Sequence, residues 1–337
     1  MELARLFPAG AHIVSLPTSN SPRILLMGCN AVKRWKESSF YPAYKFSARL
    51  YRVLLRLKAT AGLHAVCLAH SDPWLIKEFV HDVFPNICSQ VVLIGTSSPT
   101  QKLIIQIWDE ERVIAYLKFA QSAPAVTRLE REHEILRRLP PGISPTVLRF
   151  GEMGSGKGLL LTPIFGKALT TQLPPPQTLC SFVRSLETSL KVPIHNHPWI
   201  QELRSYSRDC VEPWIDRLSK RQWPIVYQHG DLAPWNLFLS RGKLEAVDWE
   251  YGTAEGFPYA DIIHYYLQVS LLIYKSSPHK TKHYLIKFLN NLLKDFSPGE
   301  IAALVNLSVF NTFIQAEHDG HQQHSNYQAW RRAIWMI

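Results

Sequence analysis

The chain has 337 residues, of which 46% are hydrophobic and 19% charged, enough to bury one large core or two. Lysine and arginine outnumber acidic residues by 37 to 27, so the formal net charge is +10. The amino terminus has no long apolar run after its positive charge, and no stretch approaches the ~18 consecutive apolar residues of a membrane-spanning helix. The five scattered cysteines lack a CxxC pair, which indicates reduced, mostly buried thiols in a cytoplasmic protein.

Residues 1–89 form an N-terminal extension to which the sequence assigns no function. It contains three strand-like stretches, HIVSL, RILLMG and HAVCLA, and a helix-like stretch, DPWLIKEFVHDVF. A basic amphipathic helix is predicted over residues 45–58. Its basic residues share one face: Lys45, Arg49, Arg52 and Arg56. Its large apolar residues share another: Leu50, Val53, Leu54 and Leu57.

Three interpretations of this helix remain open. It can pack by its leucine face with a solvated basic face, make peripheral contact with an anionic membrane surface, or bind nucleic acid. No recognisable nucleic-acid module accompanies the charge, and this disfavours nucleic acid as a partner.

From residue 90 the pattern becomes that of a small sheet followed by helices. Three successive strands are separated by GTSSPT and DEER, and the amphipathic helix TRLEREHEILRRL and two further strands follow. This predicts a five-stranded antiparallel lobe over residues 90–166. Residues 167–337 are largely helical, with helices predicted over 179–190, 198–221, 259–274, 281–293, 298–317 and 327–335. Strands followed by helices predict an α+β fold of two lobes.

The stretch QHGDLAPWNLFLSRGKLEAVDWEYG, residues 228–252, combines a strand hairpin with three polar groups. Asn236 and Asp248 each lie six residues from Gly242, so a turn centred on Gly242 places them opposite each other, with Cβ atoms about 5 Å apart. An amide oxygen and a carboxylate are ligands that Mg²⁺ prefers. Asp231 precedes the first strand, and from there its carboxylate can point toward a third group near the metal. The alternative is an ordinary hairpin with polar ends.

HGDLAPWN followed by VDWE resembles the motifs of the aminoglycoside phosphotransferase and choline kinase superfamily, which shares the protein-kinase-like fold. The resemblance covers roughly residue 90 onward and is strongest over residues 228–268, including YADIIHYYLQ. It implies that Asp231 is the base that orients and deprotonates an acceptor hydroxyl. It implies that Asn236 and Asp248 hold Mg²⁺ against the phosphates of ATP. Asp261 matches a buried aspartate that braces the catalytic loop.

A phosphotransferase of this kind also needs a cation in the small lobe. Lys118 lies near the end of the apolar strand VIAYLKFA, where burial of an unpaired ammonium would be costly. The following helix offers Glu130, Glu132 and Glu134, of which Glu132 best matches the lysine-pairing glutamate of the family. The alternative is a lysine that reaches from an edge strand to water.

Two further segments are assigned to ATP binding. In GTSSPTQ, Gly95 permits close backbone approach and Ser98 offers donors to phosphate, although a plain hairpin turn fits almost equally well. LLLTPIFG matches the connector between the lobes. The resemblance implies that the adenine edge meets the carbonyl of Thr162 and the amide of Ile164.

Other sites are less well supported. The His-rich stretches HDGHQQH and HNH have no nearby cysteine, so solvated loops are favoured over zinc sites: His318, His321, His324, His195 and His197. No G-x-S-x-G motif supports a serine hydrolase.

The sequence therefore predicts an ATP- and Mg²⁺-dependent phosphotransferase acting on a hydroxyl of a small molecule. The excess of basic residues disfavours a polycationic acceptor and favours a sugar, an anionic metabolite or a lipid-linked saccharide. The extension, with SPRILLMG, loosely resembles those of family members associated with bacterial cell-surface polysaccharide synthesis. The alternative is a nucleotide-binding scaffold or regulatory protein at the membrane surface. The presence of base, metal ligands and lysine favours the enzyme.

Overall fold

The computed structural model describes residues 3–28, 30–41, 43, 46–67, 74–318 and 326–336, and only the backbone of residues 46 and 47. The chain divides into two compact units. We call Met1–His133 with Pro145–Pro163 the sheet unit, and Glu134–Ser144 with Ile164–Ile337 the helical unit. An antiparallel sheet in one unit and mainly helices in the other confirm the predicted α+β, protein-kinase-like two-lobe fold.

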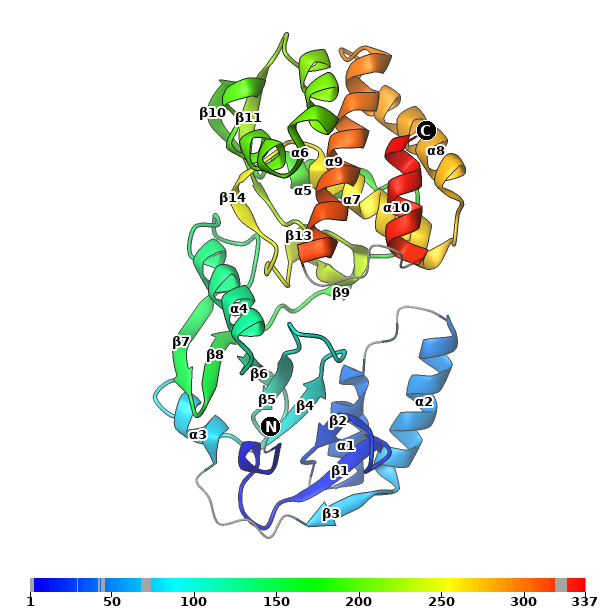
Figure 1. Ribbon diagram of the computed structural model, residues 1–337. Coiled ribbons are helices and arrows are strands. Elements are labelled where there is room, and N and C mark those ends of the chain that lie inside the picture. The colour runs from blue at the N-terminus through cyan, green and yellow to red at the C-terminus, as the bar shows by residue number, and fades with distance from the viewer. Residues whose placement is uncertain are drawn as a thin grey trace. The chain divides into compact units, whose positions relative to one another are not determined.

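Within the described residues, the sheet unit contains one sheet of eight strands in the order β3-β1-β2-β4-β5-β6-β8-β7 (Figure 1). All neighbouring pairs are antiparallel. The strands are β1 (His12–Pro17), β2 (Pro22–Leu26), β3 (Ala65–Cys67), β4 (Ser89–Ile94), β5 (Leu103–Trp108), β6 (Val113–Ala120), β7 (Val147–Met153) and β8 (Gly156–Leu161). The helices are η1 (Leu3–Leu6), α1 (Ala31–Glu37), η2 (Ser38–Phe40), α2 (Phe46–Thr60), α3 (Leu75–Val80) and α4 (Ala123–Leu136).

The N-terminal extension continues the predicted five-stranded sheet. Its strand β2 pairs with β4, and Leu25 lies opposite Val92. Because successive strand residues point to opposite faces, Leu25 joins the apolar core on one face, while Ile24 and Leu26 join the core on the other. Residues 1–89 therefore share both cores with the rest of the sheet unit.

The leucine face of the basic helix does not pack as the first interpretation predicted. Four apolar side chains of α2 are 48–59% exposed: Leu50, Val53, Leu54 and Leu57. The buried face instead consists of Leu55 and Ala59, both fully buried against the core formed with β1 and β2. Lys45 lies outside the described residues.

Contacts with α1 explain this orientation. The Arg56 guanidinium stacks 3.9 Å from the centre of the Trp35 ring and donates to the Trp35 carbonyl at 3.2 Å. Arg34 donates to the carbonyls of Ala59 and Thr60 at the end of α2. These contacts hold part of the predicted basic face against α1, and small Ala59 allows close approach to the sheet. The leucine stripe is consequently turned outward.

Glu37, at the end of α1, provides a test of the packing in the extension. Its side chain is buried and accepts a 2.6 Å hydrogen bond from Ser89. Burial raises the Glu37 pKa from 4.5 to about 7, although the Ser89 hydrogen bond opposes this shift. The folded protein thus keeps a proton that the unfolded chain releases, so stability falls as the pH rises from 4.5 to 7.

We expect Glu37→Gln to remove this fall, because glutamine has no charged form to desolvate. The variant should be more stable than the wild type at pH 8 by about 3 kcal/mol, and the difference should shrink toward pH 4.5. Urea unfolding at several pH values measures the effect, with the exposed Glu78→Gln as the matched control. Parallel pH profiles for Glu37→Gln and the wild type would contradict the buried, protonated carboxyl.

The helical unit combines two small sheets with a cluster of helices (Figure 1). One sheet has the order β10-β11-β14 and the other β13-β12-β9. The strands are β9 (Lys167–Ala168), β10 (Glu187–Pro193), β11 (Gln222–Gln228), β12 (Leu237–Ser240), β13 (Lys243–Ala246) and β14 (Thr253–Gly256). The helices are α5 (Gln177–Arg184), η3 (Ile194–Asn196), α6 (Pro198–Arg217), η4 (Pro234–Asn236), α7 (Ala260–Gln268), the π-helical η5 (Val269–Ile273), α8 (Pro278–Leu292), α9 (Pro298–His318) and α10 (Asn326–Met336).

These helices confirm most of the predicted helical segments. The segment predicted over residues 179–190 is wrong at its end, because α5 stops at Arg184 and β10 begins at Glu187. Lys191 of β10 lies opposite Pro224 of β11, so sheet pairing replaces helix there. The helices α6, α7 and α9 share one apolar core, to which α10 contributes Ile334.

No helix within the described ranges is long and apolar enough to cross a membrane. The four cysteines at described positions are free, but the expectation that most are buried is wrong. Cys67 and Cys88 are exposed, Cys210 is partly buried and Cys180 is buried.

Candidate active site

The HGD motif follows β11, and a buried aspartate from α7 fixes its backbone. Asp261 accepts hydrogen bonds from the backbone N–H groups of His229 (2.7 Å) and Gly230 (2.9 Å). Burial raises the pKa of Asp261, an effect that the His229 ring and these two hydrogen bonds oppose. The contact is the brace that the resemblance implied.

Gly230 is required by the same loop. Its φ is +80°, and a Cβ at this position would lie 2.4 Å from the carbonyl oxygen of Tyr251. A side chain would therefore meet backbone in a conformation that L residues rarely adopt. The hydrogen bonds to Asp261 and the tight fit of Gly230 against Tyr251 thus fix the backbone of the loop that carries Asp231.

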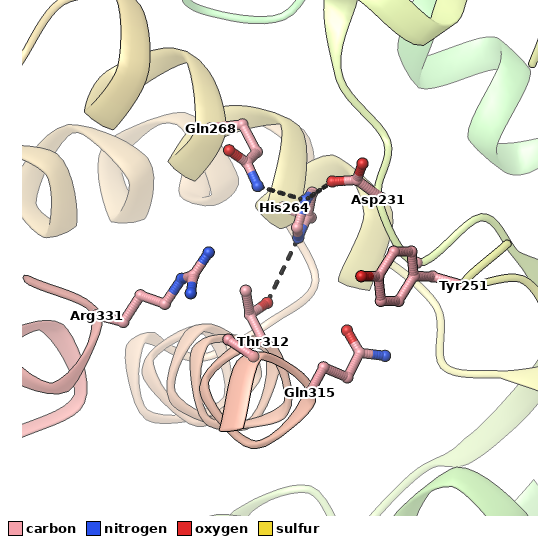
Figure 2. A pocket seen from close by; sticks show the side chains of 9 residues that line it. Asp231, Tyr251, His264, Gln268, Thr312, Gln315 and Arg331 are labelled. Atoms are coloured by element: carbon pink, nitrogen blue, oxygen red, sulfur yellow. Dashed lines mark hydrogen bonds and ion pairs between the residues drawn. The ribbon is translucent and has the colours of Figure 1, made fainter. Parts of the chain in front are cut away.

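Asp231 is one-third exposed and contacts His264 of α7 (Figure 2). Its Oδ1 lies 3.0 Å from Nε2 of His264. Because a carboxylate only accepts, this contact places a hydrogen on Nε2. The side-chain nitrogen of Gln268 lies 2.9 Å from the same His264 nitrogen. The opposite orientation of this amide would bring its oxygen there as a second acceptor for the hydrogen. His264 therefore orients the carboxylate.

A cavity of about 190 Å³ opens beside Asp231 within the helical unit (Figure 2). Its polar lining includes Asp231, Tyr251, His264, Gln268, Thr312, Gln315 and Arg331. Burial lowers the pKa of the Arg331 guanidinium, while the Asp231 and Tyr251 charges oppose this. Arginine stays protonated at neutral pH even so. Among the described lining residues, the cavity thus carries one carboxylate, one cation and several neutral hydrogen-bonding groups.

The hairpin register differs from the prediction by one residue. Strands β12 and β13 pair Leu237 with Ala246 around a two-residue turn, in which Arg241 and Gly242 have φ of +48° and +79°. Two positive φ values are typical of the type I′ turn, which suits the twist of a hairpin. The centre therefore lies between these residues, and Asn236 does not lie directly opposite Asp248. Instead, the N–H of Val247 donates to the Asn236 carbonyl at 2.9 Å.

Asn236 and Asp248 nevertheless offer oxygen ligands that suit Mg²⁺. The side-chain nitrogen of buried Asn236 donates to the Asp231 carbonyl at 3.0 Å, which turns its amide oxygen away from that carbonyl. Asp248 follows Val247 and has a φ of +68°, a strained value for a residue with a side chain. An amide oxygen and a carboxylate fit a cation that takes its remaining ligands from phosphate and water.

In the sheet unit, Lys118 of β6 forms a buried ion pair with Glu132 of α4. The lysine Nζ lies 2.6 and 2.8 Å from the two carboxylate oxygens. The side chains of Lys118 and Glu132 are 8% and 0% exposed, which excludes a lysine that reaches to water. Glu130 instead binds Lys157, and Glu134 is exposed. The structure thus pairs Lys118 with the predicted glutamate.

The geometry of the turn between β4 and β5 is sufficient to explain why residue 95 is a glycine. The Gly95 N–H donates to the Lys102 carbonyl at 3.0 Å, and a Cβ at Gly95 would lie 2.7 Å from that oxygen. Ser98 is exposed, with its hydroxyl 3.3 Å from that of Thr100. A phosphate role for Gly95 and Ser98 stays a prediction.

The predicted adenine-binding connector lies where the chain passes from one unit to the other. Thr162 pairs twice with Thr146, donating through its N–H and accepting through its hydroxyl oxygen. Ile164 is the first residue of the helical unit after this connector. The adenine contacts of Thr162 and Ile164 stay predictions.

The histidines of the two His-rich stretches have other contacts where they are described. The solvated loop expected for HNH is wrong at His197, which is buried edge-on to Phe257. His195 Nδ1 lies 2.7 Å from the Arg204 guanidinium. His321 and His324 lie outside the described residues. Within the described ranges, no group of three or more His, Cys, Asp or Glu could hold a metal.

Sequence reasoning missed most of the cavity lining, although a signal was present. In α7 the polar residues Asp261, His264 and Gln268 recur at helical spacing in an otherwise apolar helix. In α9, Thr312 and Gln315 also lie one helical turn apart. No comparable local signal marks Arg331.

No protein-family model matches the chain, and no curated protein matches it. The likenesses found are to solved structures. A WbdD complex with the kinase inhibitor LY294002 is 17% identical at a TM-score of 0.33, over 68% of this chain and 48% of that chain. A macrolide 2′-phosphotransferase type I is 13% identical at a TM-score of 0.42, over 72% of this chain and 89% of that chain.

WbdD is described as a bifunctional kinase-methyltransferase, and this chain spans about half the length of the WbdD structures it matches. These identities and TM-scores are too low to establish a family. The features that matter for function come from the chain's own described residues. The chain pairs a lysine on a sheet strand with a glutamate on the following helix, and it carries an aspartate loop in the helical unit.

Proposed function

We propose that this protein is an ATP- and Mg²⁺-dependent phosphotransferase acting on a hydroxyl of a small polar molecule. The observation that carries the proposal is the polar cavity beside Asp231. Asp261 fixes the loop that carries Asp231, and His264 orients the Asp231 carboxylate at the cavity. The free cysteines and the use of ATP favour the cytoplasm as its location.

The sheet unit would hold the nucleotide. Lys118, oriented by Glu132, directs its ammonium to the ATP phosphates, as in other kinase-like folds. Asn236 and Asp248 would hold Mg²⁺, which would supply positive charge to neutralise the charge that develops on the phosphates. The resemblance of the sequence to the phosphotransferase superfamily also assigns nucleotide binding to Gly95, Ser98, Thr162 and Ile164.

The chemical step uses Asp231. The acceptor hydroxyl donates a hydrogen bond to the carboxylate and its oxygen attacks the γ-phosphorus of ATP. The bond from the γ-phosphorus to the bridging oxygen of ADP breaks, and Asp231 takes the hydroxyl proton. His264 keeps the carboxylate directed at the acceptor, and most of the rate enhancement comes from this positioning.

The cavity lining favours a neutral or anionic polyhydroxylated acceptor. Among its described residues Asp231 is the sole carboxylate, whereas Arg331 supplies a cation that a polycationic acceptor would encounter directly. Gln268, Gln315 and Thr312 offer donors and acceptors suited to hydroxyl groups. A sugar or a sugar derivative with an acidic group fits this set.

The test is ATP consumption with a panel of neutral sugars, sugar acids, sugar phosphates and aminoglycosides. We expect stimulation by the first three classes and little by the last. Asp248→Ala should weaken Mg·ATP binding by about 10-fold or more, since it removes a charged metal ligand. Glu255→Ala, which removes an exposed carboxylate of the same unit, is the matched control.

The alternative of a nucleotide-binding scaffold makes a different prediction. It requires Mg·ATP binding that depends on Asp248 but no stimulation by any acceptor. Unchanged Mg·ATP affinity in Asp248→Ala, together with no acceptor-stimulated turnover, would contradict the kinase proposal.

A further inference from the structure

The helix α2 carries an exposed apolar ridge. Leu50, Val53, Leu54 and Leu57 recur at helical spacing and are 48–59% exposed. They form a stripe about 100° wide, on the side of the helix opposite the fully buried Leu55 and Ala59. Soluble proteins expose single apolar residues commonly, but a continuous stripe of four marks an interaction surface.

Cations flank the ridge on both sides. Arg49 and Arg56 lie along one flank, and Lys58 lies along the other. The flank of Arg56 also carries a partly exposed Trp35, on which the guanidinium stacks. Residues 30–67 contain eight lysines and arginines and a single acidic residue, Glu37, which is buried. The segment that carries the ridge is thus basic.

We propose that α2 docks this ridge onto the surface of an anionic lipid bilayer. The four apolar side chains would enter the headgroup region, and Arg49 and Lys58 would contact lipid phosphates. The helix would lie in the plane of the interface, because its opposite face stays packed on the sheet unit.

A second copy of the chain fits this surface less well. Pairing two ridges would bring the basic flanks of two helices together, and α2 offers no acidic side chain to compensate them. An anionic bilayer supplies the missing negative charge over the whole surface. Charge complementarity therefore favours lipid as the occupant.

Flotation of the full-length protein with vesicles tests the proposal. We expect binding to mixed phosphatidylcholine and phosphatidylglycerol vesicles, weak binding to pure phosphatidylcholine, and release by high salt. The double variant Leu50→Ser/Leu54→Ser should lower the partition coefficient about 10-fold or more. Arg49→Gln should lower it about 5-fold.

Two matched controls lie in the helical unit. Leu190→Ser removes a leucine that is 57% exposed, and Lys220→Gln removes an exposed cation, so both should leave vesicle binding unchanged. Equal losses in the controls, or full binding by the ridge variants, would overturn the proposal. So would a dimer in sedimentation velocity that the ridge variants dissociate, without vesicle binding by the wild type. Unchanged unfolding curves establish that the ridge variants are folded.

Discussion

Replacing Asp231 with alanine is expected to lower turnover by about 100-fold or more while leaving ATP affinity within about twofold of the wild type. The loss follows from the role proposed for the carboxylate, which orients the acceptor hydroxyl and takes its proton. ATP affinity should persist because Lys118 and its partner Glu132 belong to the sheet unit. The measurement is kcat with the best acceptor of the panel, beside calorimetric titration with Mg·ATP.

Two further variants sharpen this result. Asp231→Asn keeps the size of the side chain but is a far weaker base, so it should lose nearly as much activity as alanine. Asp216→Asn removes an exposed carboxylate of the same unit and should retain full activity. If Asp231→Asn retained wild-type turnover, Asp231 would have to be a positioning residue or a bystander, and the proposed step would be wrong.

Replacing Lys118 with methionine should affect both stability and activity. The substitution leaves the fully buried Glu132 carboxylate without this cation, and breaking a buried ion pair on one side costs about 3–5 kcal/mol. Nucleotide affinity should fall about 10- to 100-fold, the range for one hydrogen bond to a charged group. Urea unfolding and Mg·ATP titration measure the two effects separately.

The double variant Lys118→Met/Glu132→Leu separates these roles. Replacing both partners by apolar side chains also removes the Glu132 charge, so stability should return to within about 1 kcal/mol of the wild type or exceed it. Nucleotide affinity should stay low, since no ammonium reaches the phosphates. Recovery of affinity together with stability would mean that the pair is structural. The exposed pair Arg149 and Asp82, neutralised in the same way, is a control for ion-pair removal.

The sequence was sufficient to predict a contact between two elements that lie close together in the chain. The strand and the helix directly after it offered Glu130, Glu132 and Glu134 as partners of Lys118. The choice of Glu132 came from the family resemblance, and the observed pair agrees with it. The hairpin register failed by one residue, because Arg241 adopts a positive φ that nothing in its residue type indicates. A one-residue difference changes the partner of every residue in the hairpin.

Features that depend on packing between distant segments were harder to predict from the sequence. The helix α2 has apolar residues on two sides, and its contacts with Trp35 and Arg34 decide which side is buried. Likewise Arg331 reaches the cavity from α10, about 100 residues after Asp231. Neither arrangement follows from local periodicity, because periodicity identifies a face without naming what lies against it.

The continuity of the sheet has a consequence for how the protein can be divided. A fragment that begins at residue 90 would retain every residue of the predicted active site, yet it would leave β4 without its neighbour β2. Val91 and Val92, now fully buried, would then lie on an open sheet edge with unpaired backbone groups. Such an edge is a template for pairing with another chain, so the fragment would aggregate. The extension therefore covers the edge of β4 and prevents the sheet that carries Lys118 from pairing with another chain.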